Sequence, residues 1–497
     1  MFKEKKWLYP IYCLAIILAY IGLSYSPMVF NDYVWHIKAG EWMIENGKIL
    51  KTNIFSWFYP EDKFLFSHEW LAEIFIYLFK QVFKFDYLFL VFCMLLVLIP
   101  LFIIIKKEFI EKDLLTVAVV SFLIMMAFST SLYARPFFFG LFFFILLVKA
   151  LTDIKEQNNS KFYLFFPLIA ILWTNMHGGT ILFALIGPVG YLIGSLFNFE
   201  SKRVIAKKGN SSQRKKYLYL LIGNALAALV NPSGIKMYYY SFAINNSQAK
   251  AGISEWDPAS INWTTCFISI LVIIIFLILN TKKVDFTELL GLTMFFLLTC
   301  IYGRFYSWLT FYFLIVFLKY FNNKSSHFFE KEFALEIIVI TIAVAVFTGT
   351  SLMKVFPTPE YEMSKNIIDT IKEIKPQRLF NSYDTGGFLA YKDIKVFGIS
   401  LAELSTEQDC YVSKNVESFN INEALLEQYN FDYFLIDRKT VMYYHMKQHP
   451  EEFELITEDD EHSNTLWMYA IFKNLNYNEN AEYDENNYQK GVIIEEN

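Results

Sequence analysis

The chain has 497 residues, of which 55% are hydrophobic and only 19% charged, and its formal net charge at pH 7 is −5. A soluble domain carries about a quarter charged residues, so this composition excludes an ordinary soluble globular protein and predicts a polytopic α-helical membrane protein. No nucleic-acid-binding signature is present. The five cysteines form neither a CxxC metal motif nor a disulfide framework.

About eleven segments are predicted to cross the membrane, because a span needs about 20 mainly apolar residues and short candidates are extended by their flanks. The first is predicted to be a retained signal anchor, since no small-residue cleavage site follows it. The predicted spans are 7–28, 87–105, 114–133, 136–151, 162–174, 181–197, 217–230, 264–279, 287–302, 305–320 and 333–352.

Basic residues predict the orientation, because cytoplasmic loops carry an excess of Lys and Arg. Lys3, Lys5 and Lys6 place the N-terminus in the cytoplasm, and the dense basic run at 202–216 falls in a loop on the same side. We expect this run to set topology and to touch anionic lipid head groups. An odd number of spans then places the C-terminal region outside the cell membrane.

The segment 68–85 is predicted to be an amphipathic helix rather than a span. Apolar pairs recur at helical spacing, while Glu69, Glu73 and Lys80 fall elsewhere around the helix. We expect it to lie in the external interface, with its aromatic face in lipid or against the spans. If this segment crossed the membrane, every later loop would change sides. The basic run at 202–216 would then lie outside, contrary to the excess of Lys and Arg in cytoplasmic loops.

Three regions follow from these patterns. Residues 1–354 are predicted to form a transmembrane module with a first external loop at 29–86, and 355–476 a small extracytoplasmic α/β domain. In that domain KNIIDTIKEI predicts an amphipathic helix, Gly386-Gly387 a turn between apolar stretches, and YNFDYFLIDRK and LWMYAIFKN two buried strands. The acidic tail at 477–497 is predicted to be disordered.

Ionisable residues gather in the first external loop and at the external ends of the spans. Such groups are costly near hydrocarbon and tend to serve a function. Several ionisable residues at one membrane depth indicate a functional site more strongly than any one of them does. The candidate site residues are Asp32, His36, His68, Glu69, Arg135, His177 and Arg304.

This set suits transfer from a lipid-phosphate donor. Arg135 and Arg304 would bind the phosphate leaving group through charge-assisted, forked contacts. Asp32 would deprotonate the acceptor hydroxyl as general base. The spans and the amphipathic helix would form a groove for the lipid chain.

The remaining four residues, His36, His68, Glu69 and His177, would orient the phosphate or hold a divalent cation. They lack a recognised metal-ligand spacing, so the metal requirement stays open. Structural roles are the alternative. Asp32 would then cap a helix beginning near Tyr33, His68 and Glu69 would cap the amphipathic helix, and the two arginines would be interfacial anchors.

Several runs together resemble bacterial membrane proteins of the GT-C glycosyltransferase superfamily: NDYVWHIKAGEWM, FLFSHEWL, YARPFFF, LWTNMHGG and YDTGGFLAY. The resemblance covers most of the chain in order. It implies a polyprenyl-phosphate sugar donor, a soluble domain after the spans and a catalytic acid in the first external loop, which maps onto Asp32. Two departures are Asn53, where related proteins often carry Asp, and VFGISLAELS, where they often carry Asp-Gly-Arg.

The sequence therefore predicts a membrane glycosyltransferase that moves a sugar from a polyprenyl-phosphate to a cell-envelope glycan, lipid or protein outside the membrane. One alternative is a transporter or flippase for a lipid-linked glycan, which would place ionisable groups at midplane depth, where few are found. The other is a non-catalytic membrane scaffold whose external domain binds cell-wall partners.

Overall fold

The computed structural model describes residues 31–84, 86–110, 134–243, 283–320, 363–401, 429–460 and 468–480, and single positions among 120–128 and 404–416. The predicted spans 7–28, 264–279 and 333–352, most of 114–133 and the tail from 481 lie outside the described residues.

The predicted apolar segments that fall within the described residues are helical. They form α4 (Asp86–Ile110), α6 (Phe137–Lys155), α7 (Phe166–Met176), α8 (Phe183–Gly194), α9 (Ser211–Ala227), α12 (Phe286–Ile301) and α13 (Tyr306–Tyr320). In this part of the chain two stretches, Leu88–Lys106 and Phe137–Lys155, are long and apolar enough to cross a membrane. Three further apolar helices are shorter: Phe162–Met176, Gly178–Gly194 and Phe286–Ile301.

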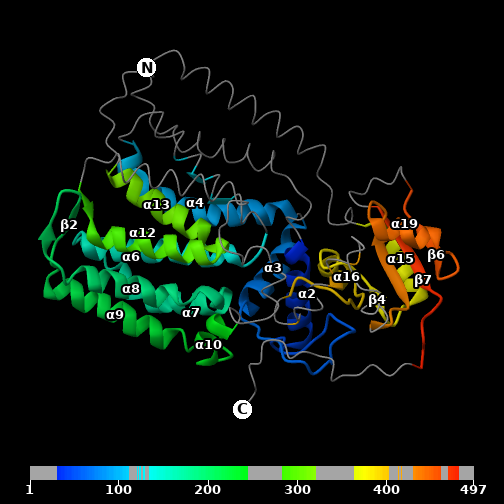
Figure 1. Ribbon diagram of the computed structural model, residues 1–497. Helices are drawn as coiled ribbons and strands as arrows, with labels where there is room; N and C mark the ends of the chain where they lie inside the picture. Colours follow the sequence, from blue (N-terminus) through cyan, green and yellow to red (C-terminus); the bar gives the residue numbers. More distant parts are fainter. Residues whose placement is uncertain are drawn as a thin grey trace.

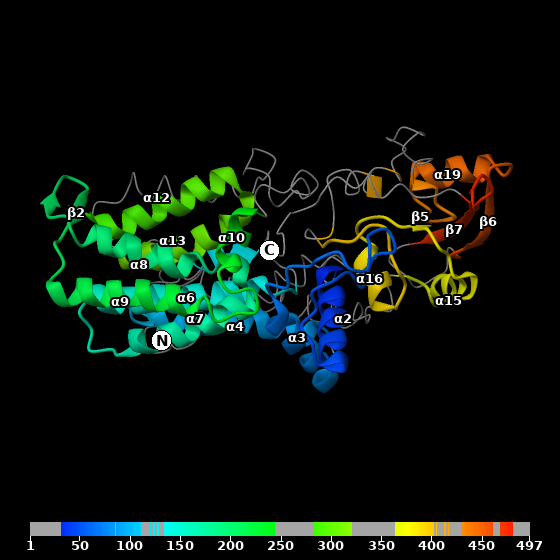
Figure 2. The same cartoon turned by 90° about the horizontal axis from the view of Figure 1, so that it is seen from below.

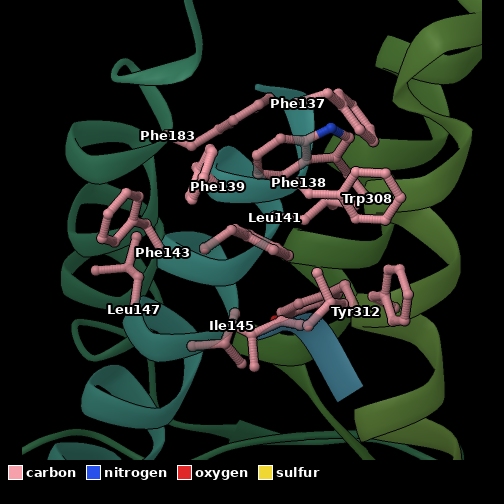
Figure 3. Packing of buried hydrophobic residues seen from close by; sticks show 14 of the residues in the cluster. Phe137, Phe138, Phe139, Leu141, Phe143, Ile145, Leu147, Phe183, Trp308 and Tyr312 are labelled. Atoms are coloured by element: carbon pink, nitrogen blue, oxygen red, sulfur yellow. The ribbon is translucent and has the colours of Figure 1, made fainter. Parts of the chain in front are cut away.

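These helices lie together as one bundle (Figure 1), with α6 against α4, α7, α8 and α9. Its core is aromatic: the Trp308 ring of α13 lies 4.9 Å from Phe144 and 4.7 Å from Phe183, between centroids. Figure 3 shows Trp308 beside the phenylalanines of α6. Aromatic pairs at such distances add about 0.5–1.5 kcal/mol beyond the burial of their area.

Basic residues 202–216 span the end of a small sheet and the start of α9. The sheet pairs β1 (Phe199–Glu200) with β2 (Val204–Ala206) and β2 with β3 (Val284–Asp285). Helix α9 begins earlier than its apolar pattern, because Asn210 and Gln213 form a capping box at its N-terminus.

The C-terminal unit, residues 363–480, contains a four-stranded mixed sheet in the order β4-β5-β7-β6. Its strands are β4 (Leu379–Phe380), β5 (Tyr433–Asp437), β6 (Phe453–Glu458) and β7 (Tyr469–Asn474), and its helices are α15 (Lys365–Ile374), α16 (Gly386–Tyr391) and α19 (Val441–Gln448). Strands β5 and β7 and helix α15 agree with the sequence patterns.

One expectation in this unit is wrong. Gly386 and Gly387 do not form a turn between apolar stretches but begin helix α16. Glycine is needed there for another reason, because a Cβ on Gly386 would lie 1.9 Å from the carbonyl oxygen of Gly398. The close approach of two backbones, rather than a reversal of the chain, explains the Gly386 position.

Helix α2 (Asn31–Asn46) lies between the bundle and the C-terminal unit (Figure 2), packed against α3 (Trp70–Phe83) and α16. Tyr33 and Ile37 belong to the core of the bundle, whereas Trp35, Ala39 and Met43 belong to the core of the C-terminal unit. Apolar residues on both sides of one helix thus join two cores. The buried part of α2 is therefore held from both directions.

Helix α3 is present, but its polar face differs from the prediction. Glu73 is buried, with 6% of its surface exposed, against α2. The two helices approach closely because position 40 is glycine, where a Cβ would lie 2.2 Å from the Glu73 carbonyl oxygen. The apolar Val82 and Phe83 are exposed instead. Periodicity could not show that a partner for Glu73 lies on α2.

Candidate functional site

Asp32 lies in the first turn of α2, with both carboxylate oxygens engaged. Its Oδ1 accepts a 2.6 Å hydrogen bond from Ser400 Oγ, and its Oδ2 accepts from Arg135 Nη1 at 3.3 Å. Arg135 precedes α6 of the bundle, and Ser400 belongs to the C-terminal unit. Asp32 is inside the helix rather than before it, so it is not the N-cap residue.

Glu69 lies between three histidines. Its Oε1 is 3.2 Å from His177 Nε2 and 3.4 Å from His68 Nε2, and its Oε2 is 3.9 Å from His36 Nε2. Glu69 immediately precedes α3, but its side chain makes no capping hydrogen bond there. The capping alternative therefore fails for Glu69.

His36 is almost fully buried and joins two carboxylates. Besides Glu69, its Nδ1 lies 3.2 Å from Glu73 Oε1. The imidazole also lies against the indole of Trp35, with centroids 3.7 Å apart. His36 follows Asp32 by one helical turn, so both face the same side of α2.

His177 is placed by the end of α7 and the short turn that follows it. Its Nδ1 is 2.7 Å from Thr180 Oγ1, and the Gly178 amide donates to the His68 carbonyl at 3.0 Å. Gly140 of α6 makes room for the ring, since a Cβ there would lie 2.6 Å from His177 Nδ1. A neutral imidazole with its proton on Nε2 suits this geometry, since Nδ1 can then accept from Thr180 while Nε2 faces the Glu69 carboxylate.

Burial and charge act together on these groups. Burial raises the pKa of Glu69, but the neighbouring histidines, His68 above all, lower that pKa well below its usual range. The pKa of His177 is lowered to about 3, mainly by burial; His68, Arg304 and Arg135 act in the same direction, and Glu69 acts against them. Glu69 is therefore ionised and His177 neutral.

His177 is expected to make the folded protein less stable in acid. Its pKa is 6.5 when exposed and about 3 when folded, so below pH 6.5 the unfolded chain binds a proton that the folded chain does not. Stability then falls by at most about 1.4 kcal/mol per pH unit from this group. In detergent, the midpoint of thermal unfolding should fall less between pH 7 and 5 for His177→Gln than for the wild type.

The matched control is His449→Gln, at the partly exposed end of α19. This variant should keep the wild-type dependence on pH. Equal slopes for the wild type and His177→Gln would contradict a buried, neutral His177.

The structure brings the predicted site residues together. Asp32 pairs with Arg135, Glu69 joins the three histidines, and Arg304, in the short turn Gly303–Phe305, is close enough for its charge to lower the pKa of His177. Two further residues of the site were not singled out from the sequence, Glu73 and Ser400. Ser400 lies in VFGISLAELS, and nothing in that run marked it.

Asn53 stabilises its own loop through hydrogen bonds to the backbone. Its side-chain nitrogen donates to the carbonyls of Ser56 and Tyr59, and its oxygen accepts from the Phe55 and Ser56 amides. An amide both donates and accepts, which a carboxylate does not. Asn at this position therefore holds the turn of the loop together.

The three histidines each contact Glu69, whereas Asp32 contacts Arg135 and Ser400, so the residues of the site are not all gathered around one point. Within the described residues, the group of ligand atoms close enough together to hold a metal ion is His449, Glu451 and Glu452, on the C-terminal unit. The sequence-based alternative of a divalent cation at His36, His68, Glu69 and His177 stays a prediction.

An open pocket, which we call the loop pocket, adjoins the site. Its cavity volume is about 30 Å³, room for about two water-sized groups at roughly 10–15 Å³ each. It lies between α2, the start of α3, the loop before α3 and the residue that follows Ser400. The lining residues are Trp35, Leu50, Phe55, Leu65, Phe66, Ser67, His68, Glu69, Glu73 and Leu401.

Comparison with solved structures identifies the fold. The archaeal oligosaccharyltransferase AglB of Archaeoglobus fulgidus, in complex with an inhibitory peptide and a dolichol-phosphate, has a TM-score of 0.53 at 13% identity, covering 89% of this chain and 71% of its own. AglB is a GT-C fold glycosyltransferase. The chain has a GT-C-like fold.

A second structure of the Archaeoglobus fulgidus oligosaccharyltransferase, tethered to an acceptor peptide with an NVT sequon, has a TM-score of 0.53 at 12% identity and covers 94% of this chain and 74% of its own. No protein-family model matches the chain, and no curated protein is similar to it in sequence. At these identities the likeness establishes the fold alone.

Proposed function

We propose that the protein is a membrane glycosyltransferase that moves a sugar from a polyprenyl-phosphate carrier to a cell-envelope acceptor outside the membrane. The observation that carries the proposal is the carboxylate of Asp32, held by Arg135 and Ser400 where the helical bundle meets the C-terminal unit. Support comes from the GT-C-like fold, and from the dolichol-phosphate in one structural neighbour.

In the proposed reaction the acceptor oxygen attacks the anomeric carbon of the sugar, on the side opposite the phosphate. The acceptor proton passes to Asp32 as general base. The bond between the anomeric carbon and the phosphate oxygen breaks, and the electron pair leaves with the lipid phosphate. Arg135 and Arg304 stabilise the charge that develops on that phosphate.

The test uses the purified full chain in lipid vesicles with a polyprenyl-phosphate that carries a radiolabelled sugar. We expect labelled sugar to leave the lipid fraction and free polyprenyl-phosphate to appear when a cell-envelope acceptor fraction is added. A flippase would move the lipid between leaflets with the sugar still attached, and a scaffold would do neither. Either of these results would overturn the proposal.

Ser400 is expected to position the carboxylate of Asp32, to which it donates a hydrogen bond. A hydrogen bond to a carboxylate is worth about 1.5–3 kcal/mol, so Ser400→Ala should lower kcat by roughly 10- to 100-fold. KM for the lipid donor should change little, because Ser400 contacts the proposed base.

Two variants of similar size separate this role from a loss of packing. Ser400→Thr keeps the hydroxyl and should retain most of the activity. Ser382→Ala removes a hydroxyl of the same unit that lies 3.3 Å from Thr385 Oγ1, and should leave kcat unchanged. A kcat of Ser400→Ala within 3-fold of the wild type, or a fall equal to that of Ser400→Thr, would contradict the role given to Ser400.

A further inference from the structure

Four residues that can ligate a metal ion lie close together where helix α19 leads into strand β6. We call them the turn cluster: His445, His449, Glu451 and Glu452. The ligand atoms of the last three all lie within 4.8 Å of one another. His445 precedes His449 by one helical turn, and the centroids of the two imidazoles are 4.5 Å apart. Figures 1 and 2 show α19 and β6 on the side of the C-terminal unit away from the helical bundle, so the cluster is separate from the site around Asp32.

A short backbone turn fixes the positions of three members of the turn cluster. Pro450 follows His449 and restricts the backbone at the start of the turn. The His449 carbonyl accepts hydrogen bonds from the amides of Glu452 and Phe453, both at 3.0 Å. The Glu452 carbonyl in turn accepts from the Leu475 amide at 2.9 Å. Because this backbone is already ordered, binding of an ion costs little further conformational entropy.

The donor atoms select the class of ion. Imidazole nitrogen together with carboxylate oxygen suits zinc and similar divalent transition metals, whereas calcium and magnesium take oxygen ligands. His449 Nδ1 lies 3.0 Å from Glu451 Oε1. Neighbouring ligands of a tetrahedral zinc, each about 2.0–2.2 Å from the ion, lie roughly 3.4 Å apart. Small rotations of these two side chains are therefore enough to admit the ion.

The second histidine supports the same assignment. His445 and His449 have the i, i+4 spacing that places two imidazoles on one side of a helix, as in zinc sites built on a helix. Lys447, which lies between them in the sequence, is engaged elsewhere. Its Nζ is 2.8 Å from the Tyr443 hydroxyl and 3.2 Å from Glu458 Oε1. The lysine charge is thus directed to Glu458 rather than to the carboxylates of the turn cluster.

We propose that the turn cluster binds a divalent transition metal ion of the zinc class, with water completing its coordination. The ion ties the end of α19 to the start of β6 and stabilises the C-terminal unit. This site is independent of the proposed glycosyltransferase function, and it is a different site from the cation expected at His36, His68, Glu69 and His177.

The experiment measures zinc binding by the full chain in detergent. The protein is treated with EDTA, freed of the chelator and titrated with ZnCl₂ against a chromophoric zinc indicator. We expect the wild type to bind one equivalent more than His449→Gln. His445→Gln and Glu452→Gln should each weaken binding of that equivalent about 10-fold or more, since loss of even an outer partner of a metal ligand costs 10- to 100-fold.

Thermal unfolding gives a second readout. A ligand that binds only the folded state raises the unfolding midpoint, so saturating zinc should raise the midpoint of the wild type more than that of His449→Gln. Without zinc the two proteins should unfold at similar temperatures, because His449 is partly exposed. This comparison separates loss of the ion from loss of the fold.

The matched control is Glu454→Gln, which changes an exposed carboxylate of β6 outside the turn cluster. It should bind as much zinc as the wild type. Equal zinc stoichiometry in the wild type and His449→Gln, or displacement of the zinc by an equal concentration of MgCl₂, would overturn the inference. Asp32→Asn should lose sugar transfer and keep the zinc equivalent, so the two proposals fail separately.

Discussion

Asp32→Asn is expected to lower the rate of sugar transfer by about 10²- to 10⁴-fold, which is the usual contribution of a general base. Asparagine has the same shape and still accepts the hydrogen bond from Ser400, but it cannot take the acceptor proton. The loss should appear in kcat, with little change in KM for the lipid donor. Release of labelled sugar from polyprenyl-phosphate in vesicles measures both constants.

The control is Asp369→Asn, which changes an exposed carboxylate on α15. It should leave the rate within 2-fold of the wild type. The midpoint of thermal unfolding of Asp32→Asn should stay close to that of the wild type, because helix α2 is held by apolar contacts on both sides. A rate within 3-fold of the wild type would show that Asp32 is not the base.

Glu69→Gln is expected to harm both stability and transfer. The variant removes the ionised group shared by His36, His68 and His177, and hydrogen bonds to a charged group are worth about 1.5–3 kcal/mol. We expect a loss of about that size in the free energy of unfolding. Transfer should fall roughly 10- to 100-fold, since glutamine carries no charge and only one acceptor oxygen, so it cannot orient all three rings.

Glu45→Gln, on the exposed side of α2, is the matched control for removal of one carboxylate and should change neither quantity. Unfolding followed by intrinsic fluorescence and transfer measured in vesicles give the two readouts. If Glu69→Gln were as stable and as active as the wild type, the contacts of Glu69 with the histidines would contribute neither to the free energy of unfolding nor to the rate of transfer.

Local patterns were enough to predict most of the described helices and two of the strands. Runs such as FFFGLFFFILLVKAL are apolar on all sides, which is typical of a helix buried in a bundle or a membrane, and YFLID shows the β-branched and aromatic composition of a buried strand. The turn predicted at Gly386-Gly387 is wrong because glycine serves close backbone approaches as well as chain reversals, and only the position of Gly398 distinguishes them.

The sequence by itself determined the apolar character of the chain, the helices that follow from it and the identity of seven ionisable residues near their ends. Only the tertiary structure decided which of these residues meet. Asp32 and Ser400 are 368 positions apart, and Glu73 acquires its partner His36 only because Gly40 lets α2 approach α3. Periodicity reports which face of a helix is apolar, whereas pairing depends on the neighbour that covers that face, and that neighbour is chosen by packing across the whole chain.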